Sequence, residues 1–284
     1  MRILCCIVVY NPNMVTLLEN IRSLINDVSR VLIWQNSELK RDEINTIKSC
    51  FGNDKLIIVG NGTNNGIPKA LNYAISQMRE LACDYLLTMD QDSIWVNFHQ
   101  FKLYVESCPK HLIYGPEIIA NTDLQRYSSR VEQLSIVENG YVITSGMLCH
   151  EKVFSRVGLF NEELFIDAVD EEYCYRARQK GIKSVQIQGA YLRQQFGESK
   201  VVSFAGKKTI VSNYSAFRYY YIVRNHIYLL RTKLPSKAER KSIIINYVRA
   251  PIFKCILFES GKIKKLWAIS RGIYAGMRIK LPEE

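Results

Sequence analysis

The stretch Tyr85-Leu86-Leu87-Thr88-Met89-Asp90-Gln91-Asp92-Ser93 decides the fold prediction for this chain. Its first five residues form a nearly continuous apolar run, which is typical of a strand covered on both faces. The run ends in two aspartates separated by one residue. Because parallel sheets bind ligands in a crevice at the carboxyl ends of their strands, we expect Asp90 and Asp92 to be site residues.

Three similar apolar runs precede this strand, and a segment with helical periodicity follows each run. This alternation predicts a doubly wound α/β domain with a mostly parallel sheet. The third helix has the clearest boundaries, because Asn64 or Asn65 can cap it and Pro68 suits its first turn. The predicted strand and helix pairs are Ile3–Val9 with Val15–Asp27, Val31–Trp34 with Asp42–Cys50, Leu56–Val59 with Pro68–Leu81, and Tyr85–Met89 with Phe98–Ser107.

Beyond Pro109 the pattern is less regular. It predicts short strands at Leu112–Tyr114, Tyr141–Thr144 and Ile182–Ile187, and a helix at Glu171–Lys180 that Gly181 closes. From Tyr214 onward, long helical patterns predict two or three helices. We therefore expect a sheet domain at residues 1–210 and a helical extension at residues 211–284.

The cysteines and histidines do not form a recognisable metal or disulfide pattern. None of the eight cysteines has CxxC spacing, and most stand in apolar stretches, so we expect them to be reduced core residues. The four histidines are scattered, without the spacing that places two ligands on one helical face. We therefore expect no zinc site.

Charge is placed unevenly along the chain. Residues 207–284 contain 17 lysines and arginines against 4 glutamates, whereas the whole chain has a net charge of +11. The longest apolar segment, 242–258, is interrupted by Arg249 and Lys254, and the first residues lack a secretory signal, so we expect a cytoplasmic protein. Aromatic and aliphatic residues stand among the basic ones, at Trp267, Ile269 and Tyr274. They favour contact with an anionic membrane surface, and a solvated helical face is the alternative.

Asp90 and Asp92 are spaced so that a turn can direct carboxylates at a hard divalent cation, although an ordinary solvated turn is the alternative. A second acidic cluster, Phe165-Ile166-Asp167-Ala168-Val169-Asp170-Glu171-Glu172, lies at the start of a predicted helix. One of its carboxylates can serve as a general base. The alternative is a stabilising first helical turn, with Glu171 or Glu172 paired to a downstream arginine.

Several segments, taken in order, resemble the family 2 glycosyltransferases with the GT-A fold, and among them the bacterial rhamnosyltransferases. Each segment alone is weak evidence, but the ordered set spans most of the chain. Besides residues 85–93 and Phe165–Asp170, the segments are Ile7-Val8-Val9-Tyr10-Asn11-Pro12, Asn65-Gly66-Ile67-Pro68-Lys69-Ala70-Leu71-Asn72, Arg176-Ala177-Arg178-Gln179-Lys180-Gly181 and Tyr220-Tyr221-Ile222-Val223-Arg224-Asn225.

The resemblance implies a role for each matching residue. Asp92, with Asp90 nearby, would meet Mg²⁺ or Mn²⁺, and Asp170 would be the base, with Asp167 and Glu172 as second choices. The reaction implied is inverting transfer of a sugar from a dTDP- or UDP-sugar, with dTDP-rhamnose as the expected donor. The acceptor implied is a growing surface polysaccharide, lipid-linked, and no nucleic acid is expected. The residues implied in nucleotide binding are Tyr10, Asn11, Pro12, Asn36, Asn65, Gly66, Asn72 and Asp90.

Two positions depart from the family pattern. Relatives usually have Asp-Asn near the second strand, where this chain has Gln35-Asn36, so the carboxylate that would read the base or ribose is absent. A histidine often precedes a Leu-Gly pair late in the domain, where this chain has Gln194-Gln195-Phe196-Gly197. An amide is a poorer metal ligand than imidazole, so the role of Gln194 stays open.

Two other functions have partial signals in the sequence. Gly60-Asn61-Gly62-Thr63-Asn64-Asn65-Gly66 approaches the dinucleotide-binding fingerprint of dehydrogenases, but its last glycine is one residue late and it follows the third strand instead of the first. The net charge and the tyrosines among arginines at residues 217–221 suggest a nucleic-acid-binding module. That charge, however, is concentrated in the C-terminal segment and not on the sheet that carries the acidic motifs.

Overall fold

The computed structural model describes residues 1–120, 133–194, 200–204, 207–211 and 213–281. The chain divides into two compact units. The N-terminal unit contains Met1–Glu162 and Val169–Gln195, and the C-terminal unit contains Glu163–Ala168 and Phe196–Glu284. The domain boundary expected at residue 210 stays a prediction.

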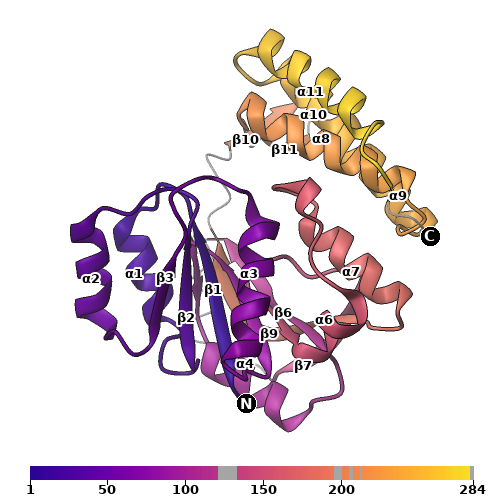
Figure 1. Ribbon diagram of the computed structural model, residues 1–284. Helices are drawn as coiled ribbons and strands as arrows, with labels where there is room; N and C mark the ends of the chain where they lie inside the picture. Colours follow the sequence, from indigo (N-terminus) through magenta and orange to yellow (C-terminus); the bar gives the residue numbers. More distant parts are fainter. Residues whose placement is uncertain (121–132, 195–199, 205–206, 212, 282–284) are drawn as a thin grey trace. The chain divides into compact units, whose positions relative to one another are not determined.

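Four parallel strands form the first half of the nine-stranded sheet in the N-terminal unit (Figure 1). Strand β1 lies between β2 and β4, and β3 pairs with β2. Residues of β1 are buried on both faces, as the continuous apolar run predicts, and the predicted alternation of strands and helices is confirmed. The elements are β1 (Ile3–Val9), α1 (Met14–Arg22), β2 (Arg30–Gln35), α2 (Arg41–Phe51), β3 (Leu56–Val59), α3 (Ile67–Glu80), β4 (Tyr85–Asp90) and α4 (Phe98–Ser107).

Helix α3 begins differently from the prediction. Its N-cap is Gly66, which has a φ of 81° and makes no side-chain cap, so the expected cap by Asn64 or Asn65 is wrong. Asn64 instead accepts the Gly66 N–H at 3.1 Å and shapes the turn before the helix. Glycine suits this position because positive φ is costly for other residues. The predicted Pro68 does lie in the first turn.

The second half of the sheet is mixed. Its strand order is β3-β2-β1-β4-β8-β6-β9-β5, with β7 paired to β9. The strand predicted at Tyr141–Thr144 is wrong, because backbone groups of this segment bond outside a strand ladder, for example the Thr144 N–H to Asp170. The elements are β5 (Ser93–Trp95), β6 (Ile113–Ala120), β7 (Ser135–Asn139), β8 (Met147–His150), α6 (Glu151–Val157), η2 (Glu162–Leu164), α7 (Val169–Gln179) and β9 (Ser184–Gln194).

An aromatic cluster fixes the segment that follows the two aspartates. Trp95 on β5 is 4% exposed, and its ring centre lies 5.0 Å from that of Phe98 and 4.8 Å from that of Phe101. Burying an aromatic side chain of this size contributes roughly 1.5–3 kcal/mol. The cluster therefore anchors β5 directly after Asp92. The eight cysteines are free in the structure, and six of them are buried, as expected for core residues.

The C-terminal unit is mainly helical. Inside it, the Glu259 carboxylate accepts the Tyr219 hydroxyl at 2.5 Å and pairs with Lys265 at 2.7 Å, both in buried positions. Within the described residues, none of the helices is both long enough and apolar enough to cross a bilayer. The elements are the hairpin β10 (Lys200–Phe204) and β11 (Lys207–Val211), which was not predicted, followed by α8 (Ala216–Arg231), α9 (Lys237–Ile243), the π-helix η3 (Ile244–Arg249), α10 (Ala250–Leu257) and α11 (Lys262–Gly276).

Candidate active site

The carboxyl ends of β1 and β4 lie side by side. Val8 pairs with Asp90, so the loop after β1 meets the turn that contains both aspartates. Gln91 joins the two segments: its Oε1 accepts the Tyr10 N–H at 2.7 Å, and its Nε2 donates to the Tyr10 carbonyl at 3.1 Å. The aspartate turn is therefore held by β1 as well as by β4.

Asn36 organises the neighbouring loops from the end of β2. Its buried side chain accepts the Asn65 N–H at 3.2 Å and donates to the Gly66 carbonyl at 3.2 Å. The next residue, Ser37, accepts the Asn11 N–H at 2.6 Å. Four of the residues implied in nucleotide binding, from three different loops, are thus brought to one edge of the sheet. Tyr10, also implied, is 52% exposed at this edge.

Asp90 is held from three sides. The Gln194 Nε2 donates to its Oδ2 at 2.9 Å, the Asn20 Nδ2 donates to its carbonyl at 2.7 Å, and its own N–H donates to the Ser145 Oγ at 3.2 Å. These contacts fix both the backbone and the carboxylate of Asp90. Asp92 is half-buried, two residues further along the same turn.

Three buried oxygen atoms around Asp90 have no hydrogen-bond partner among the described residues. They are the Asn20 Oδ1, the Ser93 Oγ and the Gln194 Oε1, and Ser93 faces Gln194 directly across the β5–β9 ladder. Buried polar atoms are normally satisfied by protein, water or an ion. The part of the chain that the structure describes contains no group of three or more His, Cys, Asp and Glu side chains able to hold a metal. A metal here would therefore rely on two carboxylates together with neutral oxygens.

Asp170 lies in the first turn of helix α7 and is held by backbone donors. Its Oδ2 accepts the Thr144 N–H at 3.1 Å, and its Oδ1 accepts the Glu171 N–H at 3.0 Å. Burial raises the pKa of Asp170 to about 6, the Glu171 carboxylate adds to the rise, and the two N–H donors oppose it. Asp170 is therefore ionised at neutral pH but binds a proton more tightly than an ordinary aspartate.

One loop connects the two acidic sites. Thr144 donates its N–H to Asp170, and the next residue, Ser145, accepts the N–H of Asp90. Thr88 on β4 fixes this loop, because its Oγ1 donates to the Thr144 carbonyl at 2.5 Å and its carbonyl accepts the Gly146 N–H at 2.7 Å. We call residues 144–146 the connecting loop. The sequence prediction missed it, although the Ser145-Gly146 pair is a turn signal.

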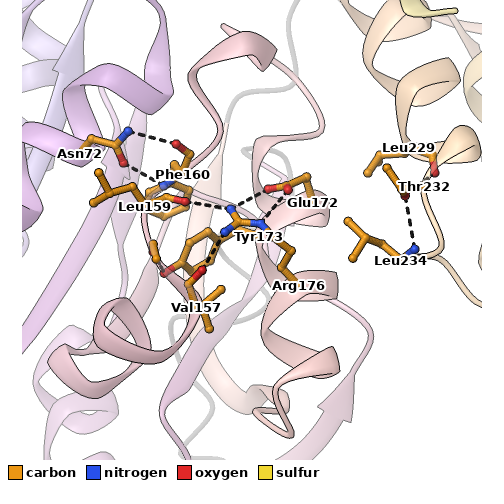
Figure 2. A network of polar contacts seen from close by, with 11 residues as sticks. Asn72, Val157, Leu159, Phe160, Glu172, Tyr173, Arg176, Leu229, Thr232 and Leu234 are labelled. Atoms are coloured by element: carbon orange, nitrogen blue, oxygen red, sulfur yellow. Dashed lines mark hydrogen bonds and ion pairs between the residues drawn. The ribbon is translucent and has the colours of Figure 1, made fainter. Parts of the chain in front are cut away.

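Glu172 and Asn72 belong to a network that holds segments of the N-terminal unit together (Figure 2). The buried Glu172 carboxylate pairs with Arg176 at 2.7 and 2.9 Å, as the alternative interpretation of the acidic cluster predicted. Arg176 also donates to the Val157 and Leu159 carbonyls. Asn72 bonds to both the N–H and the carbonyl of Phe160. Both side chains are therefore engaged in structural contacts.

Asp167, the other second choice for the base, belongs to the C-terminal unit. It has a φ of 63°, and its Oδ1 pairs with Arg218 at 3.2 Å. Asn225 donates its Nδ2 to the carbonyls of Leu164, Ile166 and Asp167 at 2.7–2.8 Å. Asn225 therefore holds the backbone turn that contains Asp167. This contact gives Asn225, in the family-like segment at residues 220–225, a structural role.

Several solved structures share this fold. They include GalNAc-T7 with UDP, GalNAc and Mn²⁺, with a TM-score of 0.57 and 11% identity over 87% of this chain and 54% of that chain. The mannosyltransferase PcManGT from Pyrobaculum calidifontis, in complex with GDP-Man and Mn²⁺, has a TM-score of 0.56 and 11% identity, covering 96% of this chain and 73% of that one. TarS 1–349 from S. aureus in complex with UDP has a TM-score of 0.57 and 13% identity, covering 97% and 81%. The chain thus spans about half of the GalNAc-T7 chain, and these likenesses establish the fold.

Sequence comparison adds a bacterial relative. No protein-family model matches the chain. The dTDP-rhamnosyl transferase RfbF of Shigella flexneri is 29% identical over 240 residues, covering 79% of this chain and 78% of the relative. The chain therefore has the GT-A fold and is similar in sequence to a bacterial glycosyltransferase. The predicted fold class and sugar-transfer activity are confirmed.

The glycines that suggested a dinucleotide-binding loop have a local structural reason. Gly60 has a φ of 103°, and a Cβ there would lie 2.8 Å from the Gln35 carbonyl oxygen. A Cβ at Gly62 would lie 2.9 Å from the Glu38 backbone nitrogen. Both glycines let the loop after β3 approach the loop after β2, which explains them without a dehydrogenase fingerprint.

Proposed function

We propose that this glycosyltransferase moves L-rhamnose from dTDP-rhamnose to a hydroxyl group of a growing, lipid-linked surface polysaccharide, with inversion at the anomeric carbon. Similarity to a dTDP-rhamnosyl transferase supports the donor, and a UDP-sugar is the alternative. The connecting loop carries the proposal for the reaction, because it bonds to both Asp90 and Asp170. The loop therefore supports both the proposed leaving-group site at Asp90 and the proposed base, Asp170.

Asp170 is the proposed general base. Its ionised carboxylate removes the proton of the acceptor hydroxyl while that oxygen forms a bond to the anomeric carbon. The bond between this carbon and the nucleotide diphosphate breaks in the same step, on the opposite face of the sugar, and inversion follows. A base with a pKa of about 6 is both ionised near neutral pH and strong enough to take a proton in the transition state.

The other acidic candidates suit this role less well. The Glu172 carboxylate is 2% exposed and bonds twice to Arg176, so using it as a base would break a buried ion pair. The Asp167 carboxylate pairs with Arg218. Asp170 is instead held by backbone N–H groups, which orient the carboxylate without taking part in proton exchange.

The residues around Asp90 fit a hard divalent cation, Mg²⁺ or Mn²⁺. Asp92 and Asp90 would supply carboxylate oxygens, and the Gln194 Oε1, buried without a hydrogen-bond partner, can supply a neutral one. A bound cation would neutralise negative charge on the departing diphosphate. The hydrogen bond from the Gln194 Nε2 already orients the Asp90 carboxylate for this task.

The loops after β1, β2 and β3 are proposed to hold the nucleotide. Tyr10, Asn11 and Pro12 border this edge of the sheet, and Asn36 positions Asn65 and Gly66 there. Gln35 cannot replace the missing carboxylate of the family pattern, because its amide bonds to the Leu39 N–H and to the Gly60 carbonyl. We therefore expect backbone groups of these loops to contribute to recognition of the base. Asn72 contributes indirectly, through the Phe160 segment.

A further part of the proposal is that the C-terminal unit meets an anionic membrane surface at the inner face of the plasma membrane. Trp267 is 61% exposed and Ile263 is 87% exposed, among the exposed Lys262 and Lys264. The expectation included Ile269, which is wrong, because Ile269 is 2% exposed and lies in the helical core. Binding to acidic vesicles and not to neutral ones, in co-sedimentation, would support this contact; equal binding to both would contradict it.

A donor panel tests the proposed function directly. Purified protein is mixed with dTDP-rhamnose, dTDP-glucose, UDP-glucose or GDP-mannose, with Mn²⁺ or EDTA, and its melting temperature is recorded. We expect the largest metal-dependent stabilisation from dTDP-rhamnose, since at equal concentration the ligand that binds the folded state most tightly stabilises it most. Stabilisation by another donor alone would reject rhamnose. The anomeric configuration of the product, read by NMR, tests inversion.

A further inference from the structure

Helices α8 and α11 of the C-terminal unit pack with their backbones in contact. They lie side by side in Figure 1. A Cβ at Gly272 would lie 2.7 Å from the Tyr220 carbonyl oxygen, and one at Gly276 would clash with the Arg224 carbonyl oxygen. Both glycines are one helical turn apart on the same face of α11. Long side chains on the two helices must therefore extend sideways from the contact.

A pocket of about 480 Å³ lies where these side chains extend. Its lining includes Arg224 and Tyr220 from α8, Arg271 and Tyr274 from α11, and Arg278 just beyond α11. Among the lining residues that the structure describes there is no carboxylate. We call this the arginine pocket. Its volume falls within the range of small-molecule sites, which is roughly 300–1,000 Å³.

Arg271 and Arg278 have aromatic rings as the only described contacts of their guanidinium groups. Arg271 lies 4.6 Å from the centre of the Trp267 ring and 5.6 Å from that of Tyr220, and Arg278 lies 4.2 Å from that of Tyr274. Among the described residues, neither guanidinium group makes a hydrogen bond or ion pair. A ring stacked on the face of a guanidinium leaves its in-plane N–H donors available. Both groups are thus oriented without being neutralised.

Arg224 is fixed in another way. Its Nη2 donates to the Glu163 and Leu164 carbonyls, and its Nε donates to Asn225. Its guanidinium also lies 4.6 Å from the Tyr221 ring centre. Neutral carbonyl and amide groups orient this guanidinium but leave its charge uncompensated. The pocket therefore concentrates three positive charges in one place.

We propose that the arginine pocket binds a phosphate or diphosphate group. The guanidinium fork matches phosphate oxygens and binds them with charge-assisted hydrogen bonds. The tyrosine hydroxyls can add neutral donors. A carboxylate ligand would need fewer positive charges than the pocket provides. The site lies wholly within the C-terminal unit, separate from the aspartates of the candidate active site.

Such a group can come from two sources. One is the diphosphate of a lipid-linked acceptor, which rests on the proposed function, and the other is the headgroup of an anionic phospholipid. The exposed Trp267 stacked on Arg271 places an apolar ring next to the charged groups. A phosphate attached to a lipid satisfies both features. The shared chemistry is the phosphate, and the experiment separates the sources.

Binding is measured by calorimetry on the full chain in EDTA and without nucleotide sugar, so that the proposed metal and donor site is silent. The probes are inorganic pyrophosphate, farnesyl diphosphate, and vesicles of phosphatidylglycerol or phosphatidylcholine. We expect Arg271→Gln and Arg278→Gln each to weaken pyrophosphate binding about tenfold, which corresponds to one lost charge-assisted hydrogen bond. Arg271→Lys should also weaken it, because lysine lacks the fork.

Lys241→Gln is the matched control, since it removes one exposed charge from the same unit, outside the pocket and outside the proposed membrane contact. It should leave pyrophosphate binding unchanged. Competition by farnesyl diphosphate identifies the acceptor type of ligand, and competition by phosphatidylglycerol but not phosphatidylcholine vesicles identifies the headgroup. An equal loss in Lys241→Gln, or no pyrophosphate binding by the unaltered protein, would overturn the proposal. Because no transfer is measured, either result leaves the proposed reaction to its own test.

Discussion

The two units of the chain hold charged side chains by different means. Around Asp90 and Asp170 in the N-terminal unit, carboxylates accept hydrogen bonds from loop N–H groups and amide side chains. In the C-terminal unit, Arg271 and Arg278 lie against aromatic rings. Hydrogen bonds tune the proton affinity of a carboxylate, whereas rings orient a guanidinium and leave its charge intact. The first arrangement suits proton transfer and metal binding, and the second suits the binding of anions.

The largest effect should come from removing the proposed base. Asp170→Asn keeps the size of the side chain but cannot accept a proton, so transfer should fall by about 10³-fold, within the range for general base catalysis. Donor binding, measured by calorimetry, should be unchanged. Asp54→Asn makes the same chemical change at an exposed surface position of the same unit and should have no effect. Near-normal turnover by Asp170→Asn would reject the base assignment.

The next largest effect should come from the proposed metal ligand. Asp92→Ala removes a carboxylate from the turn, so donor binding in Mn²⁺ should weaken by about 100-fold, at the upper end of the losses reported for residues that support metal sites. Binding in EDTA should be the same for the variant and the unaltered protein. A loss of equal size with and without metal would show that Asp92 has a structural role only.

A substitution at Gly276 tests whether the arginine pocket can be altered without affecting the donor site. Gly276→Ala places a methyl group against the Arg224 backbone, so the α8–α11 contact must open. We expect a loss of about 1–3 kcal/mol in the free energy of unfolding, the usual cost of overpacking, read from urea titration. Pyrophosphate binding in EDTA should also weaken, while dTDP-rhamnose binding in Mn²⁺ should not. An equal loss of dTDP-rhamnose binding would show that the arginine pocket and the donor site do not act independently.

The pH profile should report the raised pKa of Asp170. The ionised form is the base, so kcat/KM should be constant above neutral pH and fall as the carboxylate is protonated below about 6. At pH 5 the rate should be about tenfold below the plateau, since protonation of one group lowers activity tenfold per pH unit. Donor binding measured across the same range serves as the control. A profile that stays flat down to pH 5 would contradict the role of Asp170.

The smallest effect should come from Gln194. Gln194→Ala removes the hydrogen bond to Asp90 and one neutral oxygen, so the Mn²⁺ concentration for half-maximal donor binding should rise by roughly tenfold or less, as for residues that orient a metal ligand. Gln194→His, which restores the family residue, should bind Mn²⁺ at least as well as the unaltered protein. An unchanged Mn²⁺ requirement in Gln194→Ala would exclude Gln194 from the metal site.

The parallel half of the sheet could be predicted because its strands are continuous apolar runs and its helices have regular apolar spacing. The bounds of α4 agree with the prediction, and those of α2 and β4 differ by one residue at most at each end. The mixed half was harder. Tyr141–Thr144 has an apolar pattern, but its backbone bonds to Asp170 and Thr88, which no local pattern reveals. Tertiary hydrogen bonds override local propensity there.

The acidic side chains of the candidate site could be predicted from the sequence, but the residues that hold them in place could not. Asp90 and Asp170 are far apart in the chain, and the connecting loop that serves both has no periodic signal. The arginine pocket depends on the close contact that Gly272 and Gly276 allow between α11 and α8. The spacing of two glycines in a helix does not by itself reveal which helix packs against them. Such contacts arise from tertiary structure and have no counterpart in a linear pattern.

The bond pair between Gln91 and Tyr10 has a consequence for the middle residue of the aspartate turn. The side-chain amide of Gln91 acts like a peptide unit, giving and receiving one bond with the β1 backbone beyond the last paired residues. These two bonds extend the hydrogen bonding between the two segments by one position, through a side chain. Glutamate would lack the donor, and asparagine is one methylene shorter. The residue between the two aspartates therefore ties the aspartate turn to β1, and its identity determines how rigidly both carboxylates are held.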